Sequence, residues 1–409
     1  MLYGQGSSAT RNKSARGSAG QAAVLHVLRK RLHAAPRAWD FLSIALAIVT
    51  ADVADWRSES PDGWTRELDL EIAVTDPEFW NGQARAIEEA LKFLSTDVWH
   101  LRFVAGGFRP ATPQNPIYPL EDCVVLLSGG LDSLIGAIDL ATDGKKPFAV
   151  SNVVRGDSEN QLAFAQSIGG GLRHLPLNHN ATPPWSKEDS QRARSIIFIA
   201  FGVLAGTTLK SYHDGSRVPF YVCENGFIAI NPPLTGTRLG SLSTRTAHPE
   251  FLNRIRDIIA AANLRIDLIN PYENSTKGEM MLACKNQALL RSLAPRSVSC
   301  GRYRVYNYNH CGRCIPCQVR RSAFLSWDAS LDTTYYRYND LGRRDREHAH
   351  FDDVRSLAMA LLEVESAGLD AWLGAALSYP RMGDPCPIRD LVARGLAELS
   401  ALHDYFGVE

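Results

Sequence analysis

One stretch of six residues has the composition and spacing of an anion-binding loop. It follows the apolar run at residues 123–127 and consists of Ser128, Gly129, Gly130, Leu131, Asp132 and Ser133. The two glycines allow the backbone to approach an anion with its amide groups pointing inward. The N-terminus of the helix expected to follow adds positive partial charge. The hydroxyls of Ser128 and Ser133 can donate to phosphate oxygens, whereas Asp132 repels phosphate unless it binds Mg²⁺ or caps the helix. The loop is therefore predicted to bind a metal-bound polyphosphate.

This loop differs from the most common phosphate-binding motif. The sequence G-x-x-x-x-G-K-[ST] occurs nowhere in the chain. The lysine with which a Walker A loop reaches the outer phosphates is therefore missing. A different class of nucleotide site is indicated.

A second group of residues has the composition of a metal site. It consists of Cys300, Cys311, Cys314 and Cys317. Four thiolates suit tetrahedral Zn²⁺ at about 2.3 Å each. Iron–sulfur proteins share the C-x2-C-x2-C spacing, but the usual fourth cysteine followed by proline is absent. His310 could replace one cysteine as a ligand. The spacing predicts a structural zinc in a reducing compartment.

The elements that position these groups can be predicted from hydrophobic periodicity. Within residues 120–325, apolar runs at 123–127, 148–154 and 219–223 alternate with helical stretches at 131–141, 193–209 and 251–262. Such alternation is typical of an α/β fold with a parallel sheet and helices on both faces.

Flanking regions are predicted on both sides. Residues 1–119 are interpreted as a flexible basic start followed by a small α+β module, because the first 39 residues hold seven Lys/Arg and no acid. The module has a helix over 39–54, strands over 68–74 and 99–104, and between these strands a helix that Asp76 caps at Pro77. Residues 326–409 are predicted to be mostly helical, with amphipathic stretches at 354–362 and 388–402.

Composition limits the remaining choices. The chain has 409 residues, with 44 basic and 44 acidic side chains and 45% apolar residues. This length suggests two or three domains. The apolar fraction excludes wholesale disorder, and the charge balance excludes a dominant basic arm or acidic tail. The longest apolar stretch, 41–54, falls short of the about 20 residues that a membrane span needs. No secretory signal is recognised, so we expect a cytoplasmic protein.

Residues 120–325 resemble a known protein family in both motifs. The 128–133 loop resembles the S-G-G-x-D-S signature of the PP-loop ATP pyrophosphatases. Together with the four cysteines it resembles their 7-cyano-7-deazaguanine synthase (QueC-like) branch. Arg192-Ala-Arg194 is similar to the arginine-led helix of that branch, and Lys277-Gly-Glu279 to its Pro … Lys-x-Glu segment. The added terminal regions are similar to the QatC-like proteins of bacterial anti-phage defence operons.

The resemblance implies a fold and a reaction. The fold is an adenine-nucleotide α-hydrolase-like, Rossmann-like sheet. ATP with Mg²⁺ is cleaved between its α- and β-phosphates by a carboxylate such as that of 7-carboxy-7-deazaguanine. This gives an acyl-adenylate, from which an amine displaces AMP. The implied catalytic residues are Asp132 near Mg²⁺, Ser133, and the charge-neutralising Arg194 and Lys277.

The implied substrate-binding residues are Glu224, Asn225 and Arg238. Glu224 follows a strand end, where ligands of α/β proteins gather, and a carboxylate there can accept from a guanine-like edge. The segment around it departs from the family pattern, which leaves the acceptor open between ammonia and the amino group of a partner protein of a defence system.

Two rival functions stay open. The first is a tRNA thiolase with Cys223 as the reactive cysteine, although nucleic acid is not favoured because only residues 302–321 interleave basic and aromatic side chains. The second is an ATP-binding scaffold without catalysis. A homodimer is also left open.

Overall fold

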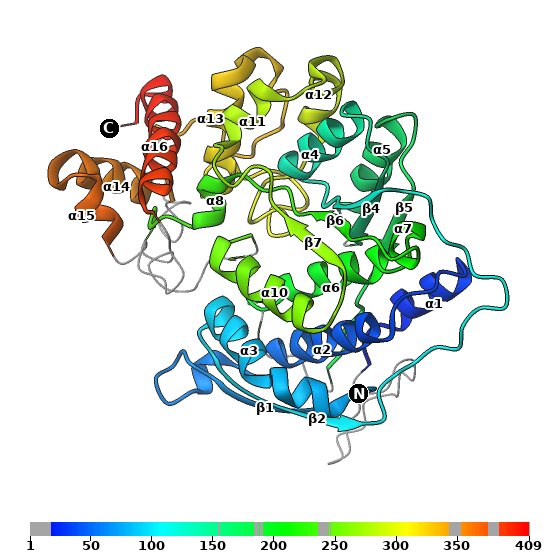
Figure 1. Cartoon of the computed structure of the whole chain (residues 1–409). Helices are drawn as coiled ribbons and strands as arrows, with labels where there is room; N and C mark the ends of the chain where they lie inside the picture. The colour runs from blue at the N-terminus through cyan, green and yellow to red at the C-terminus, as the bar shows by residue number, and fades with distance from the viewer. Residues whose placement is uncertain are drawn as a thin grey trace.

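A five-stranded parallel sheet forms the centre of the computed structural model (Figure 1). The structure describes residues 18–153, 156–183, 188, 191–235, 245, 247–342, 353–374 and 384–408. The strands are β1 (Glu67–Val74), β2 (Val98–Ala105), β3 (Cys123–Leu126), β4 (Pro147–Asn152), β5 (His174–Leu177), β6 (Val218–Tyr221) and β7 (Ile266–Ile269). The helices are α1 (Gln21–Arg29), α2 (Pro36–Asp52), α3 (Pro77–Ser95), α4 (Leu131–Thr142), α5 (Ser158–Ser167), α6 (Ser195–Gly206), α7 (Lys210–His213), α8 (Gly226–Ile230), α10 (Pro249–Ala261), α11 (Lys277–Ala283), α12 (Gln287–Leu293), α13 (Ile315–Asp328), α14 (Asp353–Ala367), α15 (Leu369–Leu373) and α16 (Cys386–Phe406). Short 3-10 turns are η1 (Arg57–Glu59), η2 (Ala294–Arg296) and η3 (Ala329–Leu331).

The order of the central sheet is β5-β4-β3-β6-β7. The chain first builds β3, β4 and β5 toward one edge, then returns to place β6 on the free side of β3. Val124 of β3 accordingly pairs with Phe148 of β4 and with Phe220 of β6. The loops that leave the carboxyl ends of β3 and β6 therefore diverge from neighbouring strands. Ligands of open α/β sheets bind at such a switch point.

Helices cover both faces of this sheet, which confirms the predicted α/β class. Val124 belongs to a hydrophobic cluster that includes α2, α6 and α10, whereas its neighbour Val125 belongs to a cluster with α4, α11 and α13. This alternation follows from the period of two along a strand. Strands β5 and β7 were not predicted from the sequence. Each has only four residues and includes a polar one, His174 in β5 and Asp267 in β7, which breaks the apolar run.

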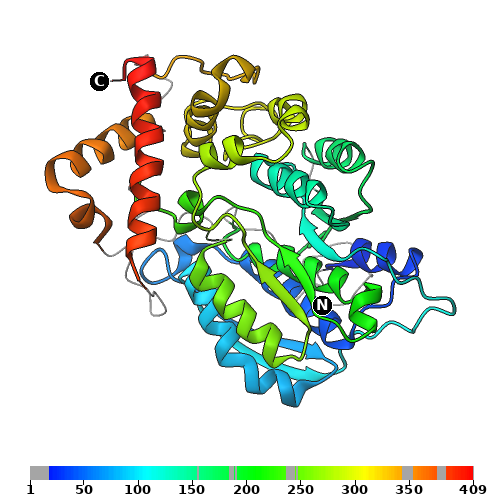
Figure 2. The same ribbon diagram turned by 45° about the horizontal axis from the view of Figure 1, so that its top comes forward.

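The N-terminal elements form a β-α-β unit. Strands β1 and β2 pair in parallel, and α3 connects them. Asp76 caps α3 as predicted, since its carboxylate accepts from the Phe79 amide at 3.3 Å. Helices α2 and α3 lie against α6 and α10 (Figures 1 and 2). One hydrophobic cluster contains side chains from both regions. The predicted domain boundary near residue 119 is therefore spanned by a shared core.

The prediction of a flexible start is wrong for residues 21–29. They form α1, with Ala23, Val24 and Val27 buried. The physical reason is that apolar side chains three and four residues apart share one helix face, which packs on the core. Residues 1–17 lie outside the described part of the chain.

The C-terminal region is helical, as predicted. Helices α14, α15 and α16 share a hydrophobic cluster with α8 and α13, in which Leu391 and Leu399 of α16 are fully buried. In Figure 1 these helices form the orange and red group beside α8 and α13. No helix in the described part of the chain is both long enough and apolar enough to cross a membrane.

Candidate functional site

The 128–133 loop lies at the switch point of the central sheet. It connects β3 to α4, as the sequence predicts. Gly129 adopts φ +86°, a left-handed conformation in which a larger residue would be strained. In the described part of the chain no side chain caps the N-terminus of α4. The first-turn amide groups of α4 are therefore available to an anion.

The serines brace the loop from within. Ser133 Oγ accepts from the Ser128 amide at 3.2 Å, lies 3.0 Å from Ser128 Oγ and donates to the Gly130 carbonyl at 3.0 Å. Gln161, which sequence analysis did not single out, donates from Nε2 to the Ser128 carbonyl at 3.2 Å. Leu131 contributes only backbone to the loop, because its side chain is buried in the core beneath α4.

Asp132 is nearly buried and is surrounded by donors. One carboxylate oxygen forms an ion pair with Lys277, whose side chain is also nearly buried. The other accepts from Asn225 Nδ2 at 2.7 Å and from the Asn225 amide at 3.2 Å. Asn225 Oδ1 caps α8 by accepting from Ile228 at 3.0 Å. The side chain of Asn225 therefore orients Asp132, and the residue is fully buried, which does not suit the predicted contact with a substrate.

Two further charged residues complete the site. Glu224 is half-buried, and its carboxylate has no hydrogen-bond partner in the described part of the chain. Burial and the charge of Asp132 raise the pKa of Glu224 to about 7, although Lys277 and Arg194 oppose this shift.

Arg194 is exposed to solvent at the start of α6. The protein atoms around it lower the pKa of its guanidinium, while the charges of Asp157 and Glu224 raise it. Asp157 was not predicted. Its backbone and Cβ lie beside Gly129, and burial raises its pKa to about 6. The site thus combines two cations with three carboxylates around one loop.

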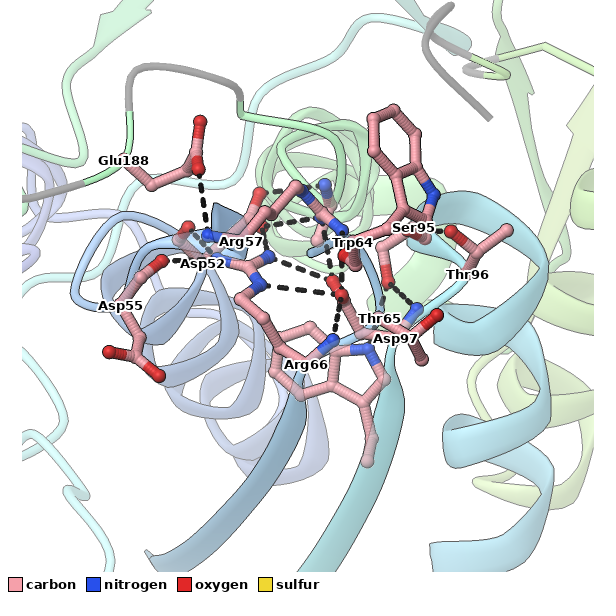
Figure 3. Close-up of polar contacts among 12 residues, drawn as sticks. Asp52, Asp55, Arg57, Trp64, Thr65, Arg66, Ser95, Thr96, Asp97 and Glu188 are labelled. Carbon is pink, nitrogen blue, oxygen red and sulfur yellow. Dashed lines mark hydrogen bonds and ion pairs between the residues drawn. The ribbon is translucent and has the colours of Figure 1, made fainter. Parts of the chain in front are cut away.

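A buried ionic cluster in the N-terminal region holds the segment that leads to Arg194 (Figure 3). Asp52 Oδ2 accepts from the Ala193 amide at 2.8 Å. Arg66 bridges Asp52 and Asp97 at 2.6 and 2.8 Å, and Arg57 adds a second contact to Asp97 at 2.7 Å. Burial alone would raise the pKa of Asp97, but hydrogen bonds from the two arginines outweigh it and lower the pKa. Breaking such a buried pair costs about 3–5 kcal/mol.

Arg192 belongs to that cluster. Its guanidinium lies 4.2 Å from the centroid of the Trp64 ring. Loss of solvent lowers its pKa to about 10. Of the two arginines that sequence analysis noted at 192 and 194, only Arg194 is within electrostatic reach of Asp157 and Glu224.

The four cysteines converge, as their spacing predicts. Their sulfur atoms all lie within 4.8 Å of one another, and all four residues are buried. The Cys300–Cys314 and Cys311–Cys317 sulfur pairs are each 3.9 Å apart. Tetrahedral bonds of about 2.3 Å would place sulfurs about 3.8 Å apart. The cluster can therefore hold a metal such as zinc.

Backbone groups support charge on these sulfurs. The amides of Arg302 and Cys311 donate to Cys300 Sγ, and that of Cys314 donates to Cys311 Sγ, each at 3.3 Å. His310 is not part of the group, because its Nε2 accepts from the Ser299 amide at 3.1 Å. Burial and Arg320 lower the pKa of His310 to about 3.

The segment that precedes Cys300 contacts the 128–133 loop, and buried arginines bind backbone around the cysteine group. Arg320 donates to Ser297 Oγ at 2.7 Å and to the Ala294 carbonyl at 3.0 Å. The intervening Val298 amide donates to the Gly129 carbonyl at 3.0 Å. Arg313 and Arg321 likewise bind backbone carbonyls. These three arginines are thus used in the structure, and none faces the loop as a phosphate ligand.

Two of the sequence-based candidates need separate comment. Arg238 lies outside the described residues. Cys223 is buried, and a Cβ at Gly136 of α4 would lie 2.2 Å from its sulfur. Burial and the charges of Asp132 and Asp139 raise the pKa of Cys223, which disfavours the thiolate that a nucleophile needs.

Comparison of the chain with protein-family models, curated proteins and solved structures found no match.

Proposed function

We propose that this chain is a PP-loop ATP pyrophosphatase that activates a carboxylate as an acyl-adenylate and transfers the acyl group to an amine. The proposed substrate is a deazapurine carboxylate such as 7-carboxy-7-deazaguanine. Attack of the carboxylate on the α-phosphate of ATP releases pyrophosphate, and the amine then displaces AMP. Ammonia or an amino group of a partner protein in a defence system would serve as the amine.

The observation that carries this proposal is the position of Asp132. It stands at the switch point of a parallel sheet and contacts Lys277 and Asn225. Among the described residues, no side chain caps the helix that follows the loop. A carboxylate beside an anion-binding loop suits a nucleotide that arrives with Mg²⁺. Glycine backbone and hydroxyl groups of the loop would hold pyrophosphate.

The surrounding charges suit the developing transition state. Lys277 pairs with Asp132, and its ammonium would neutralise charge that develops on the phosphates. The Arg194 guanidinium, for which the described part of the chain supplies no hydrogen-bond acceptor, would neutralise charge at the α-phosphate. Glu224 lies within electrostatic reach of both cations and would accept hydrogen bonds from a guanine-like edge.

We propose zinc as the metal of the four-cysteine group, with a structural role. Four thiolates leave no position open for a substrate or water. The link from Val298 to Gly129 means that an intact cysteine group would also hold the loop in place.

The test is to incubate the protein with ATP, Mg²⁺ and 7-carboxy-7-deazaguanine and to measure AMP and pyrophosphate with and without the acid. We expect acid-dependent formation of both products in equal amounts. Asp132→Asn should lower the rate about 100-fold or more. Asp143→Asn is the matched control, because Asp143 lies at the other end of α4 in an exposed ion pair with Lys285.

Other outcomes would redirect the assignment. AMP formation that does not depend on the acid would refute the substrate class. Product formation that survives in Asp132→Asn would refute the role of the loop. ATP binding without turnover, together with biological activity that persists in Asp132→Asn, would favour the non-catalytic scaffold.

A further inference from the structure

The C-terminal helix α16 contacts the turn that carries Lys277. Thr276 is the N-cap of α11, and its hydroxyl donates to Glu398 Oε1. The Gly278 amide donates to Glu398 Oε2 at 3.4 Å. The Glu398 carboxylate thus binds the residues on both sides of Lys277. It also supplies an acceptor to the first turn of α11, where helix amides lack intrahelical partners.

This contact requires glycine at position 278. A Cβ on Gly278 would lie 2.5 Å from Glu398 Oε1 and 2.9 Å from Glu398 Cδ. Any larger residue would force the carboxylate away from the turn. The close approach therefore depends on both residues, which are separated by 120 positions in the sequence.

The same helix also packs on α8, which begins at the residue after Asn225. A Cβ on Gly395 of α16 would lie 2.2 Å from the Phe227 ring, and a Cβ on Gly226 would lie 2.7 Å from Leu391. Helix α16 thus contacts both elements that supply donors to Asp132. The contact to α11 is polar and half-buried, whereas the contact to α8 is apolar and part of a buried cluster.

We propose that Glu398 is a positioning residue that holds the first turn of α11 so that the Lys277 ammonium reaches Asp132. This inference rests on the proposed function only for its effect on turnover. The placement of Lys277 can be measured without any activity. The C-terminal region thereby acquires a defined role at a site built by other segments of the chain.

The first experiment measures the access of reagent to Lys277. The full-length protein is labelled with a limiting amount of acetic anhydride, and acetylation of each lysine is quantified by peptide mass spectrometry. The Lys277 side chain is 9% exposed, whereas the Lys210 side chain is 52% exposed in a surface ion pair with Asp214 and serves as the internal reference. Glu398→Ala should raise the ratio of Lys277 to Lys210 labelling about fivefold or more. Asp390→Ala, an exposed acid on the same helix, should leave it unchanged.

A second variant disturbs the contact between Glu398 and the α11 turn by changing α11. Gly278→Ala keeps Glu398 and favours the helix, but its Cβ displaces the carboxylate. It should raise the labelling ratio as Glu398→Ala does. If the ratio stays at the wild-type value in both variants, the positioning role is wrong, whatever the activity. If the rise in Lys277 labelling tracks a loss of overall stability in urea unfolding of the variants, the cause is global opening, and the positioning role is again wrong.

Steady-state kinetics then tests the effect on the reaction. A misplaced group that acts only in the transition state lowers kcat and kcat/KM for ATP together. We expect Glu398→Ala to lower both about tenfold or more. Glu398→Gln, which keeps one acceptor oxygen, should fall between it and the wild type. A rise in KM alone would refute the positioning role. Increased labelling in the variants with an inactive wild type would instead refute the proposed function.

Discussion

Replacing Glu224 by glutamine should stabilise the protein above neutral pH. The folded-state pKa of Glu224 is about 7 against an ordinary value of 4.5, chiefly because burial and Asp132 disfavour its charge. A raised pKa means that the folded state binds the proton more tightly than the unfolded state does. The stability that this proton contributes is therefore complete below pH 4.5 and is lost as the pH rises through 7. At about 1.36 kcal/mol per pKa unit, the ionised carboxylate costs up to about 3 kcal/mol. Residual contact with solvent lowers the expected gain to about 1–3 kcal/mol.

The measurement is urea unfolding of both proteins at intervals between pH 5 and pH 8.5. The stability difference between Glu224→Gln and the wild type should be small at pH 5, should grow up to about pH 7 and should level off above it. Glu363→Gln is the control, because Glu363 is exposed on α14 and its carboxylate is solvated. A difference that does not depend on pH, or destabilisation of Glu224→Gln at pH 8, would refute this account of the site.

Three further predictions concern stability and metal content. Asp52→Asn should lower the free energy of unfolding in urea by about 3–5 kcal/mol, because it removes the negative charge that pairs with buried Arg66. A loss below about 1 kcal/mol would contradict this expectation. For the proposed zinc site we expect one zinc per chain by elemental mass spectrometry, and Cys317→Ser should lower this content; full retention would exclude Cys317 as a ligand. Gly136→Ala should destabilise by about 1–3 kcal/mol, because its Cβ would lie 2.2 Å from the Cys223 sulfur. Gly82→Ala is the control, because a Cβ at position 82 would meet no atom within 4 Å, and it should stabilise by up to about 1 kcal/mol in thermal unfolding. If both substitutions change the stability equally, steric overlap with Cys223 does not explain the effect at Gly136.

The two rival functions make different demands on the site. A thiolase needs an accessible thiolate, and Cys223 is buried with a raised pKa. A scaffold would not need a nearly buried Asp132–Lys277 pair, because such pairs give little net stability compared with apolar residues.

Much of the local structure could be predicted because it depends on neighbouring residues. Asp76 and Pro77 begin α3 through a cap and a preset φ angle, and both act within one turn. The alternation of strands and helices determines which residues can be buried, and hence the α/β class. The spacing of Cys311, Cys314 and Cys317 places three sulfurs on one short segment. These features were determined by the sequence itself.

Tertiary structure alone decided which distant groups meet. Glu398 contacts the Lys277 turn, and Asp52 binds Ala193 across 141 positions. No local pattern encodes such contacts, because they depend on how helices pack on the sheet and on each other. The role of Asn225 shows the same limit: its position after a strand was predictable, but its use in orienting Asp132 follows from the place of β6 beside β3. The sequence supplies the chemical groups and their local elements, and packing decides which of them form a site.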